Sequence, residues 1–152
     1  MIKNKNAFEA IIEIQKEDPE LLLCGSAALI IRDVMDDRDL GDIDFVVNEK
    51  YLDSITSVTN LDLDRYPNQE SDRYQSYHGT YYVGGENWPI NVLVFDNDVA
   101  LNKEHVIYYN FVKITTQDID TILYYKKKYN RKKDIKDLEK IANKCVEELL
   151  AE

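Results

Sequence analysis

The chain has 152 residues, of which 44% are hydrophobic and 32% are charged, a composition typical of a single globular domain. Its formal charge of −10, from 29 acidic and 19 basic residues, disfavours broad nucleic-acid binding, which needs a cationic face. No apolar run reaches the roughly 20 residues of a membrane span, no signal peptide is expected, and two distant cysteines exclude a disulfide framework, so a cytoplasmic protein is expected.

The first part of the chain is predicted to alternate helices and strands. The expected elements are a helix over 7–16, a buried strand over 20–24, a helix over 27–34, a strand over 42–47 and a helix over 51–58. Pro19 marks the end of the first helix, and Ser26 is the expected N-cap of the second.

The second part is predicted to contain a hairpin and then two helices. The expected elements are a loop over 60–72, strands over 73–83, 89–95 and 110–114, and helices over 116–129 and 132–150. Gly84-Gly85 is a hairpin turn signal. Apolar residues step by three or four along the last helix and predict its buried face: Ile135, Leu138, Ile141, Cys145 and Leu149.

This element order predicts an α+β or α/β sandwich with a small mixed β-sheet and flanking helices. With no linker, repeat or low-complexity tract, residues 1–152 are expected to form one domain. Its core would span about residues 20–115, and its C-terminal helical part about residues 116–152.

The features that carry chemistry lie between residues 21 and 47. Gly25-Ser26 stands between a predicted strand and helix, where the backbone can approach a phosphate closely. Asp42 and Asp44 are two apart on a predicted strand, so both carboxylates point to one face. Two adjacent carboxylates repel unless a cation lies between them, and hard oxygen ligands suit Mg²⁺. The combination predicts a triphosphate site beside a metal pair, as phosphoryl transfer requires.

Each of these features also has a simpler interpretation. A Gly-Ser pair before a helix is usually a tight turn, and an Asp-x-Asp pair is most often solvated surface charge. Here Asp44 lies inside an apolar strand, where an acid costs free energy unless it has a partner, which favours the functional interpretation.

The sequence from Gly25-Ser26 to Asp42-Ile43-Asp44 resembles the signature of nucleotidyltransferases with the DNA polymerase β type of fold. Arg38, four residues before Asp42, resembles an arginine upstream of the Asp pair in several of these groups. That superfamily includes minimal nucleotidyltransferases, aminoglycoside nucleotidyltransferases and abortive-infection toxins, the last connected with toxin–antitoxin systems. Residues 126–138 are similar to the Lys…Arg-x-Lys-Asp-x-x-Asp-Leu pattern of the abortive-infection type.

The resemblance implies a Mg²⁺-dependent transfer of a nucleoside monophosphate from an NTP to a hydroxyl acceptor. Asp42 and Asp44 would bind Mg²⁺ and act in catalysis. The implied nucleotide-binding residues are Gly25, Ser26, Arg38, Lys126, Arg131, Lys133 and Asp134. The acceptor would be a protein, a small molecule or a tRNA end, and no membrane is implied.

Asn91 departs from the family pattern. It occupies the predicted place of a third carboxylate, which in the family helps to bind metal and activates the acceptor hydroxyl. An amide can ligate Mg²⁺ through its oxygen but cannot take a proton as a base. Asp96, five positions on, would point to the opposite face of the strand. Leu40 also stands where the family often has Thr or Ser.

Three hypotheses follow. The first is an active nucleotidyltransferase with Asp42, Asp44 and Asn91 in its site. The second is a catalytically degenerate member of this fold, acting as a binding, structural or interaction protein. A protein partner and a viral origin are the further options that this hypothesis leaves open. The third is a structural domain in which the Asp pair is surface charge.

A basic segment contrasts with the acidic remainder of the chain. Residues 126–136 contain seven basic side chains and one acid, so this segment is +6 and the rest is −16. It is either a solvated helix face or a site for an anion such as a triphosphate.

The remaining candidates have mostly structural interpretations. His78 and His105 are isolated, so zinc is not expected, and both are expected to be surface or loop histidines. Cys24 is expected to be a small buried residue. The eleven tyrosines would pack on strand faces or stack on a base.

Overall fold

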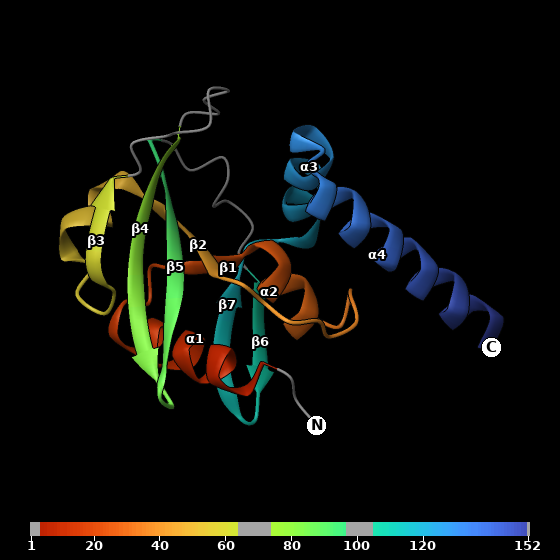
Figure 1. Ribbon diagram of the computed structural model, residues 1–152, viewed down its shortest axis with the longest axis horizontal. Helices are drawn as coiled ribbons and strands as arrows, with labels where there is room; N and C mark the ends of the chain where they lie inside the picture. The colour runs from red at the N-terminus through yellow and green to blue at the C-terminus, as the bar shows by residue number, and fades with distance from the viewer. Residues whose placement is uncertain (1–3, 64–73, 97–104, 152) are drawn as a thin grey trace.

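The computed structural model describes residues 4–63, 74–96 and 105–151. The chain forms a seven-stranded mixed sheet in the order β3-β4-β5-β2-β1-β7-β6, with helices packed against it (Figure 1). The helices are α1 (Lys5–Glu17), α2 (Gly25–Ile31), the 3-10 helix η1 (Glu49–Ser54), α3 (Ile119–Tyr129) and α4 (Lys132–Ala151). The strands are β1 (Leu22–Cys24), β2 (Ile43–Asn48), β3 (Thr59–Leu63), β4 (Tyr74–Val83), β5 (Glu86–Phe95), β6 (His105–Tyr109) and β7 (Val112–Thr116). The predicted α+β class, with a mixed sheet and flanking helices, is confirmed.

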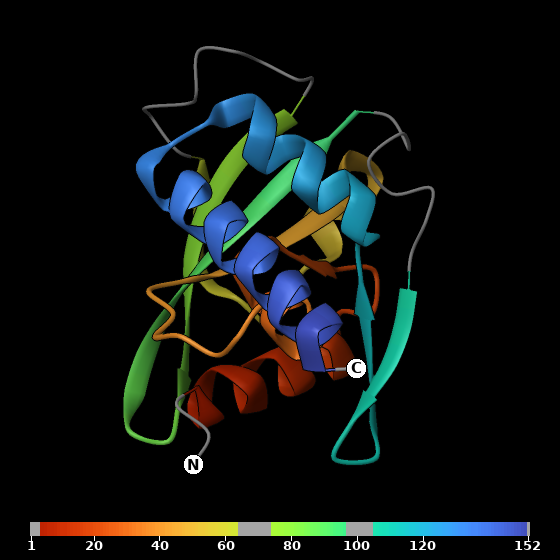
Figure 2. The same cartoon turned by 90° about the vertical axis from the view of Figure 1, so that its right-hand side faces the viewer.

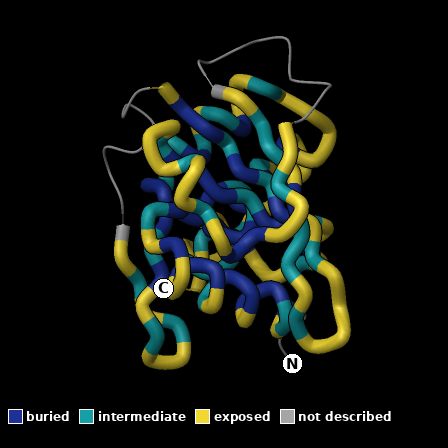
Figure 3. The backbone as a smooth tube through the Cα atoms, turned by 90° about the vertical axis from the view of Figure 1, so that its left-hand side faces the viewer, coloured by how far each residue is buried: buried dark blue, intermediate teal, exposed yellow. Residues whose placement is uncertain are grey.

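The main core lies on one face of the sheet. β2 turns Ile43, Phe45 and Val47 to this face, and all three are fully buried. They belong to one apolar cluster with α1 and α2, which include Ile11 and Leu29. In Figure 3 the central strands are drawn mostly in the colour of buried residues. The alternation of β2 therefore leaves Asp42 and Asp44 on the other face.

The strand register sets side chains of four strands in one row across the other face. Cys24 pairs with Asp44 in the antiparallel β1–β2 ladder, and Asp44 pairs with Asn91 in the parallel β2–β5 ladder. Asn91 pairs in turn with His78 in the antiparallel β4–β5 ladder. Because directly paired residues point to the same face, these four side chains lie side by side.

Several predicted elements need correction. The predicted helix over 51–58 is the 3-10 helix η1, and β3 lies where a loop over 60–72 was predicted. The part of that loop beyond residue 63 lies outside the described residues. β6 was not predicted, and the turn at Asn110 and Phe111, both with positive φ, links it to β7. Ser26 is not an N-cap: α2 begins at Gly25, its N-cap is Cys24, and no side chain caps it.

The predicted buried face of α4 is also largely wrong. Only Ile141 among its five residues is buried, whereas Ile135 is 40% exposed and Leu149 is 69% exposed. Cys145 is exposed as well. The buried residues of α4 are Asp134, Asp137 and Ile141, all in its first half, and its C-terminal part extends away from the sheet (Figure 1).

None of the helices that the structure describes combines the length and apolar character that a membrane crossing needs.

Candidate active site

A pocket of about 480 Å³ lies over the row of side chains described above. The sheet contributes Asp44, Asn91 and His78, and Asp42 lies directly before β2. The helices α3 and α4 lie over this face of the sheet (Figure 2). Both predicted metal ligands line the pocket. All the predicted nucleotide-binding residues except Asp134 line it as well: Gly25, Ser26, Arg38, Lys126, Arg131 and Lys133.

The carboxylates of Asp42, directly before β2, and Asp44, within β2, are joined by one amide. Asn91 Nδ2 donates to Asp42 Oδ2 at 2.9 Å and to Asp44 Oδ1 at 2.8 Å. Asn91 Oδ1 lies 2.6 Å from His78 Nδ1. Both N–H groups of the amide are therefore used by the carboxylates, and its oxygen faces the imidazole. His78 is exposed and hydrogen-bonded, as expected for a surface histidine, but it lies within β4 and lines the pocket rather than lying in a loop.

Asp44 is an unfavourable site for a negative charge. Burial and then the neighbouring charge of Asp42 raise the pKa of Asp44 from its ordinary value to about 6. The hydrogen bond from Asn91 and the charges of Lys133 and Lys126 act in the opposite direction without cancelling this effect. The pair therefore has a negative potential that a bound cation would neutralise.

Only glycine fits at position 25, because the backbone there lies against the carboxylate of Asp44. The φ of Gly25 is +66°, and a Cβ atom at this position would lie 2.7 Å from Asp44 Oδ2. A side chain there would be strained by the backbone conformation and would collide with the carboxylate. Gly25 thus allows β1 and α2 to approach Asp44 closely.

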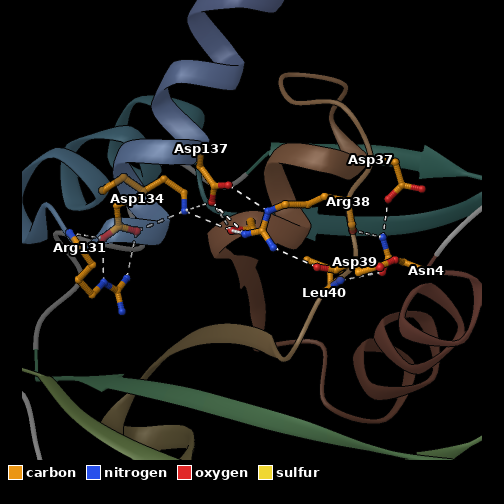
Figure 4. A network of polar contacts seen from close by, with 10 residues as sticks. Asn4, Asp37, Arg38, Asp39, Leu40, Arg131, Asp134 and Asp137 are labelled. Atoms are coloured by element: carbon orange, nitrogen blue, oxygen red, sulfur yellow. Dashed lines mark hydrogen bonds and ion pairs between the residues drawn. The ribbon is translucent and has the colours of Figure 1, made fainter.

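A second acidic pair, Asp134 and Asp137, lies at the start of α4 and is almost fully buried. Arg38 donates to Asp137 twice, from Nε to Oδ1 and from Nη2 to Oδ2, each at 3.0 Å. Lys126 Nζ and Ser26 Oγ also donate to Asp137 Oδ2, at 3.0 and 2.8 Å. Figure 4 shows Arg38 reaching Asp137 from the loop before β2. These bonds tie α3 and α4 to the segment that carries the site.

Asp134 closes the first turn of α4. It accepts the backbone N–H of Arg131 at 3.2 Å and Arg131 Nε at 2.7 Å, and Lys126 Nζ lies 3.6 Å away (Figure 4). Burial acts to raise the pKa of both acids. The hydrogen bonds and charge of Arg131 outweigh it at Asp134 and lower the pKa, and those of Arg38 and Lys126 lower the pKa of Asp137 to about 2.

The network assigns a structural partner to several predicted nucleotide-binding groups. The Ser26 hydroxyl donates to Asp137 and also accepts from Arg38 Nη2 at 2.8 Å and from Lys126 Nζ at 3.2 Å. By contrast, no described residue forms an ion pair or hydrogen bond with the side chain of Lys133, which is exposed at the pocket. Its charge instead acts on Asp44, whose pKa it lowers.

Sequence reasoning missed two residues that build the site. Asp137 was visible as the second acid of the Asp134-x-x-Asp137 pattern, whose spacing puts both on one helix face. Asn4 is 2% exposed, and it donates to Asp37 and to the carbonyl oxygen of Arg38 and accepts from the backbone N–H of Leu40 (Figure 4). Asn4 thereby fixes the loop before Asp42, and no local sequence pattern indicates this long-range contact.

One wall of the pocket is aromatic. Tyr125 and Tyr129 of α3 are stacked, with ring centroids 6.0 Å apart and planes at 16°, and both line the pocket. Phe95 of β5 lies 6.4 Å from Tyr125 between centroids. Cys24 is buried beside this wall, as expected, and burial followed by the charge of Asp44 raises the pKa of its thiol.

The residues present fit a magnesium ion. Among the residues that the structure describes, no three His, Cys, Asp or Glu side chains converge on one metal position. Mg²⁺ is commonly held by one or two carboxylates together with substrate phosphates and water, which the Asp42 and Asp44 pair can provide. The carbonyl oxygen of Asn91 is a further ligand type for this ion, although in the structure it faces His78.

Comparison with solved structures finds partial likenesses. A candidate nucleotidyltransferase from H. pylori matches with 20% identity and a TM-score of 0.43, over 78% of this chain and 54% of that one. JHP933 from Helicobacter pylori matches with 19% identity and a TM-score of 0.40, over 78% of this chain and 52% of that one. The chain thus spans about half the length of these proteins. No family model and no curated protein matches the sequence.

Proposed function

We propose that the protein binds a nucleoside triphosphate with Mg²⁺ in this pocket and transfers the nucleoside monophosphate to a hydroxyl group. The observation that carries the proposal is the pair formed by Asp42, directly before β2, and Asp44, within β2, which both line a pocket of about 480 Å³. Among the described residues, the neutral amide of Asn91 donates to both carboxylates, and the charges of Lys133 and Lys126 offset the raised pKa of Asp44 only in part.

The walls of the pocket suit the two ends of a nucleotide. Lys133 and Arg131 lie on the side of α4 and would meet the phosphates as cations. Tyr125 and Tyr129 would offer an apolar face to the base. Asp42 and Asp44 would hold Mg²⁺, which when bound neutralises charge on the phosphoryl oxygens.

In the proposed reaction, the acceptor oxygen forms a bond to the α-phosphorus while the bond to the leaving pyrophosphate breaks. Arg38, Lys126 and Ser26 keep their bonds to Asp137, and so hold α3 against the site. The hydroxyl proton would pass to solvent water at the pocket mouth, because an amide is not a base at neutral pH and Asn91 cannot accept it.

Asn91 favours a second candidate function, a nucleotide-binding protein without transferase activity. Such a protein would keep the metal pair and the pocket. It would lack a proton acceptor, because Asn91 occupies the predicted place of the third carboxylate. It would act through a protein partner, as expected for a degenerate member of the fold.

The exposed lysines of the basic segment, residues 126–136, indicate which class of acceptor the protein would use. Lys126 is buried and paired, whereas the exposed lysines are Lys127, Lys128, Lys132, Lys133 and Lys136. These exposed cations would guide a short anionic acceptor such as a tRNA end, in a cytoplasmic setting and with no membrane involved. Protein and small-molecule hydroxyls are the other acceptor classes to be screened.

Thermal melts test the binding step. The wild type and Asp42→Asn/Asp44→Asn would be melted with each NTP, with and without Mg²⁺, and Asp53→Asn, an exposed acid of η1, is the matched control. A ligand at one hundred times its Kd adds about 2.7 kcal/mol of stability. We expect the NTP to raise the melting temperature of the wild type and of Asp53→Asn when Mg²⁺ is present. The melting temperature of the double variant should not change. If no NTP raises the wild-type melting temperature, the proposal is wrong.

Transfer is then measured with α-labelled nucleotide and the three acceptor classes. Label in an acceptor, lost in Asp42→Asn/Asp44→Asn, supports the transferase. Binding without label in any acceptor supports the second candidate.

A further inference from the structure

The Asn91 amide and the His78 imidazole constrain each other. Asn91 gives both N–H groups to the carboxylates of Asp42 and Asp44, at 2.9 and 2.8 Å. Its oxygen is left to face His78 Nδ1 at 2.6 Å. A carbonyl oxygen only accepts hydrogen bonds, so Nδ1 must carry the proton in this arrangement.

The reverse amide orientation is excluded while the pair holds no cation. It would bring the amide oxygen to within hydrogen-bond distance of two carboxylate oxygens with no proton between them. Like partial charges at that distance repel, and the two hydrogen bonds to Asp42 and Asp44 would be lost. The metal-free site therefore specifies the amide orientation and, through it, the imidazole tautomer.

A divalent cation at the carboxylate pair reverses this preference. N–H groups that point toward the pair are repelled by the ion, whereas an amide oxygen is attracted to it. The oxygen and nitrogen of a carboxamide have nearly the same shape, so exchanging them by rotation needs little space. After the exchange Nδ2 faces His78, and Nδ1 must then accept, which places the imidazole proton on Nε2.

We propose that His78 is a positioning residue whose tautomer is coupled to the orientation of the Asn91 amide, and that a divalent cation at Asp42 and Asp44 switches both together. This inference rests on the metal site of the proposed function. It explains how a chain without the third carboxylate presents an oxygen to the ion: the amide supplies it without a third negative charge, and His78 stabilises either orientation.

The tautomer is read directly by nuclear magnetic resonance of ¹⁵N-labelled imidazole rings. The chain has two histidines, so His105→Gln leaves His78 as the only signal. The measurement is made at about pH 8, where an ordinary imidazole is neutral, with MgCl₂ added to saturation. We expect the Nδ1–H tautomer without Mg²⁺ and the Nε2–H tautomer with it.

Asn91→Asp is the matched control for this measurement. A carboxylate accepts at both oxygens and donates at neither, so His78 should keep its proton on Nδ1 with and without Mg²⁺. A switch in this variant would contradict the role assigned to the amide.

A binding measurement separates the inference from the proposed function. Calorimetric titration of MgCl₂ should show binding that Asp44→Asn removes. His78→Phe should weaken it about 10-fold, the usual effect of losing a residue that orients a ligand, and His78→Gln, which can donate or accept, should restore most of it. If Mg²⁺ binds but His78 keeps the Nδ1–H tautomer, the inference is wrong and the metal site stands. If no binding depends on Asp44, both are wrong.

Discussion

The two acidic pairs of this protein have opposite electrostatic surroundings. Asp134 and Asp137 lie among Arg38, Lys126 and Arg131, which lower the pKa of both carboxyls. Asp42 and Asp44 accept hydrogen bonds from a neutral amide, the charges of Lys133 and Lys126 offset burial and repulsion only in part, and the pKa of Asp44 is raised to about 6. The first pair is neutralised by the protein itself and connects the helices to the sheet. The second is left uncompensated in a pocket, which is the arrangement expected for a site that binds a cation.

The largest expected effect comes from breaking the compensated pair. Asp137→Asn should lower the free energy of unfolding by about 3 to 5 kcal/mol, because Arg38 and Lys126 would lose the charge that offsets their burial. Urea unfolding measures this change. Asp53→Asn, which removes an exposed acid, should stay within about 0.5 kcal/mol of the wild type. A loss below about 1 kcal/mol for Asp137→Asn would mean that the network contributes little.

Removing a charge from the uncompensated pair should change the free energy of unfolding in the opposite direction. At about pH 8 and without divalent cations, Asp44→Asn should raise the free energy of unfolding by about 2 kcal/mol, because it relieves burial of a charge and repulsion by Asp42. The same urea experiment measures it. A destabilised variant would show that the Asn91 hydrogen bonds outweigh the repulsion.

The two pairs should also give opposite pH dependences. The folded pKa of Asp44 is raised, so its favourable contribution is present below its unfolded value and is lost as pH rises through about 6. The folded pKa of Asp137 is lowered, so its contribution is present above the unfolded value and is lost as pH falls through about 2. Unfolding curves across this range should show that Asp44→Asn removes the decline in the free energy of unfolding as pH rises toward about 6 and keeps the decline as pH falls toward about 2. Identical pH profiles for the variant and the wild type would contradict the raised pKa.

The smallest effect is expected at the exposed ion pairs of α4. Lys144 lies 2.6 Å from Asp33 and 3.1 Å from Asp36, whose side chains are 88% and 73% exposed. Lys144→Gln should cost less than about 1 kcal/mol, and about 1 M NaCl should abolish the difference from the wild type. A larger, salt-independent loss would mean that Lys144 contributes through packing.

Local patterns were sufficient to predict the centre of the fold. The alternation of residues 42–47 placed Asp42 and Asp44 on one face, and Gly25, the first residue of α2, indicated a close backbone approach. The bond between Asn91 and His78 depends on the β4–β5 register, which no local pattern specifies. The exposure of Ile135 and Leu149 could not be predicted either, because an amphipathic pattern shows that a helix has an apolar face but not what covers it.

The central claim, that the Asp42 and Asp44 pair is a cation site, is tested most directly by the free energy of unfolding of the wild type and Asp44→Asn across a Mg²⁺ titration. Without Mg²⁺ the variant should be the more stable protein. Added Mg²⁺ should stabilise the wild type and leave the variant unchanged, so that the difference between them shrinks and then reverses. If Mg²⁺ stabilises both proteins equally, or neither of them, the pair is not a cation site.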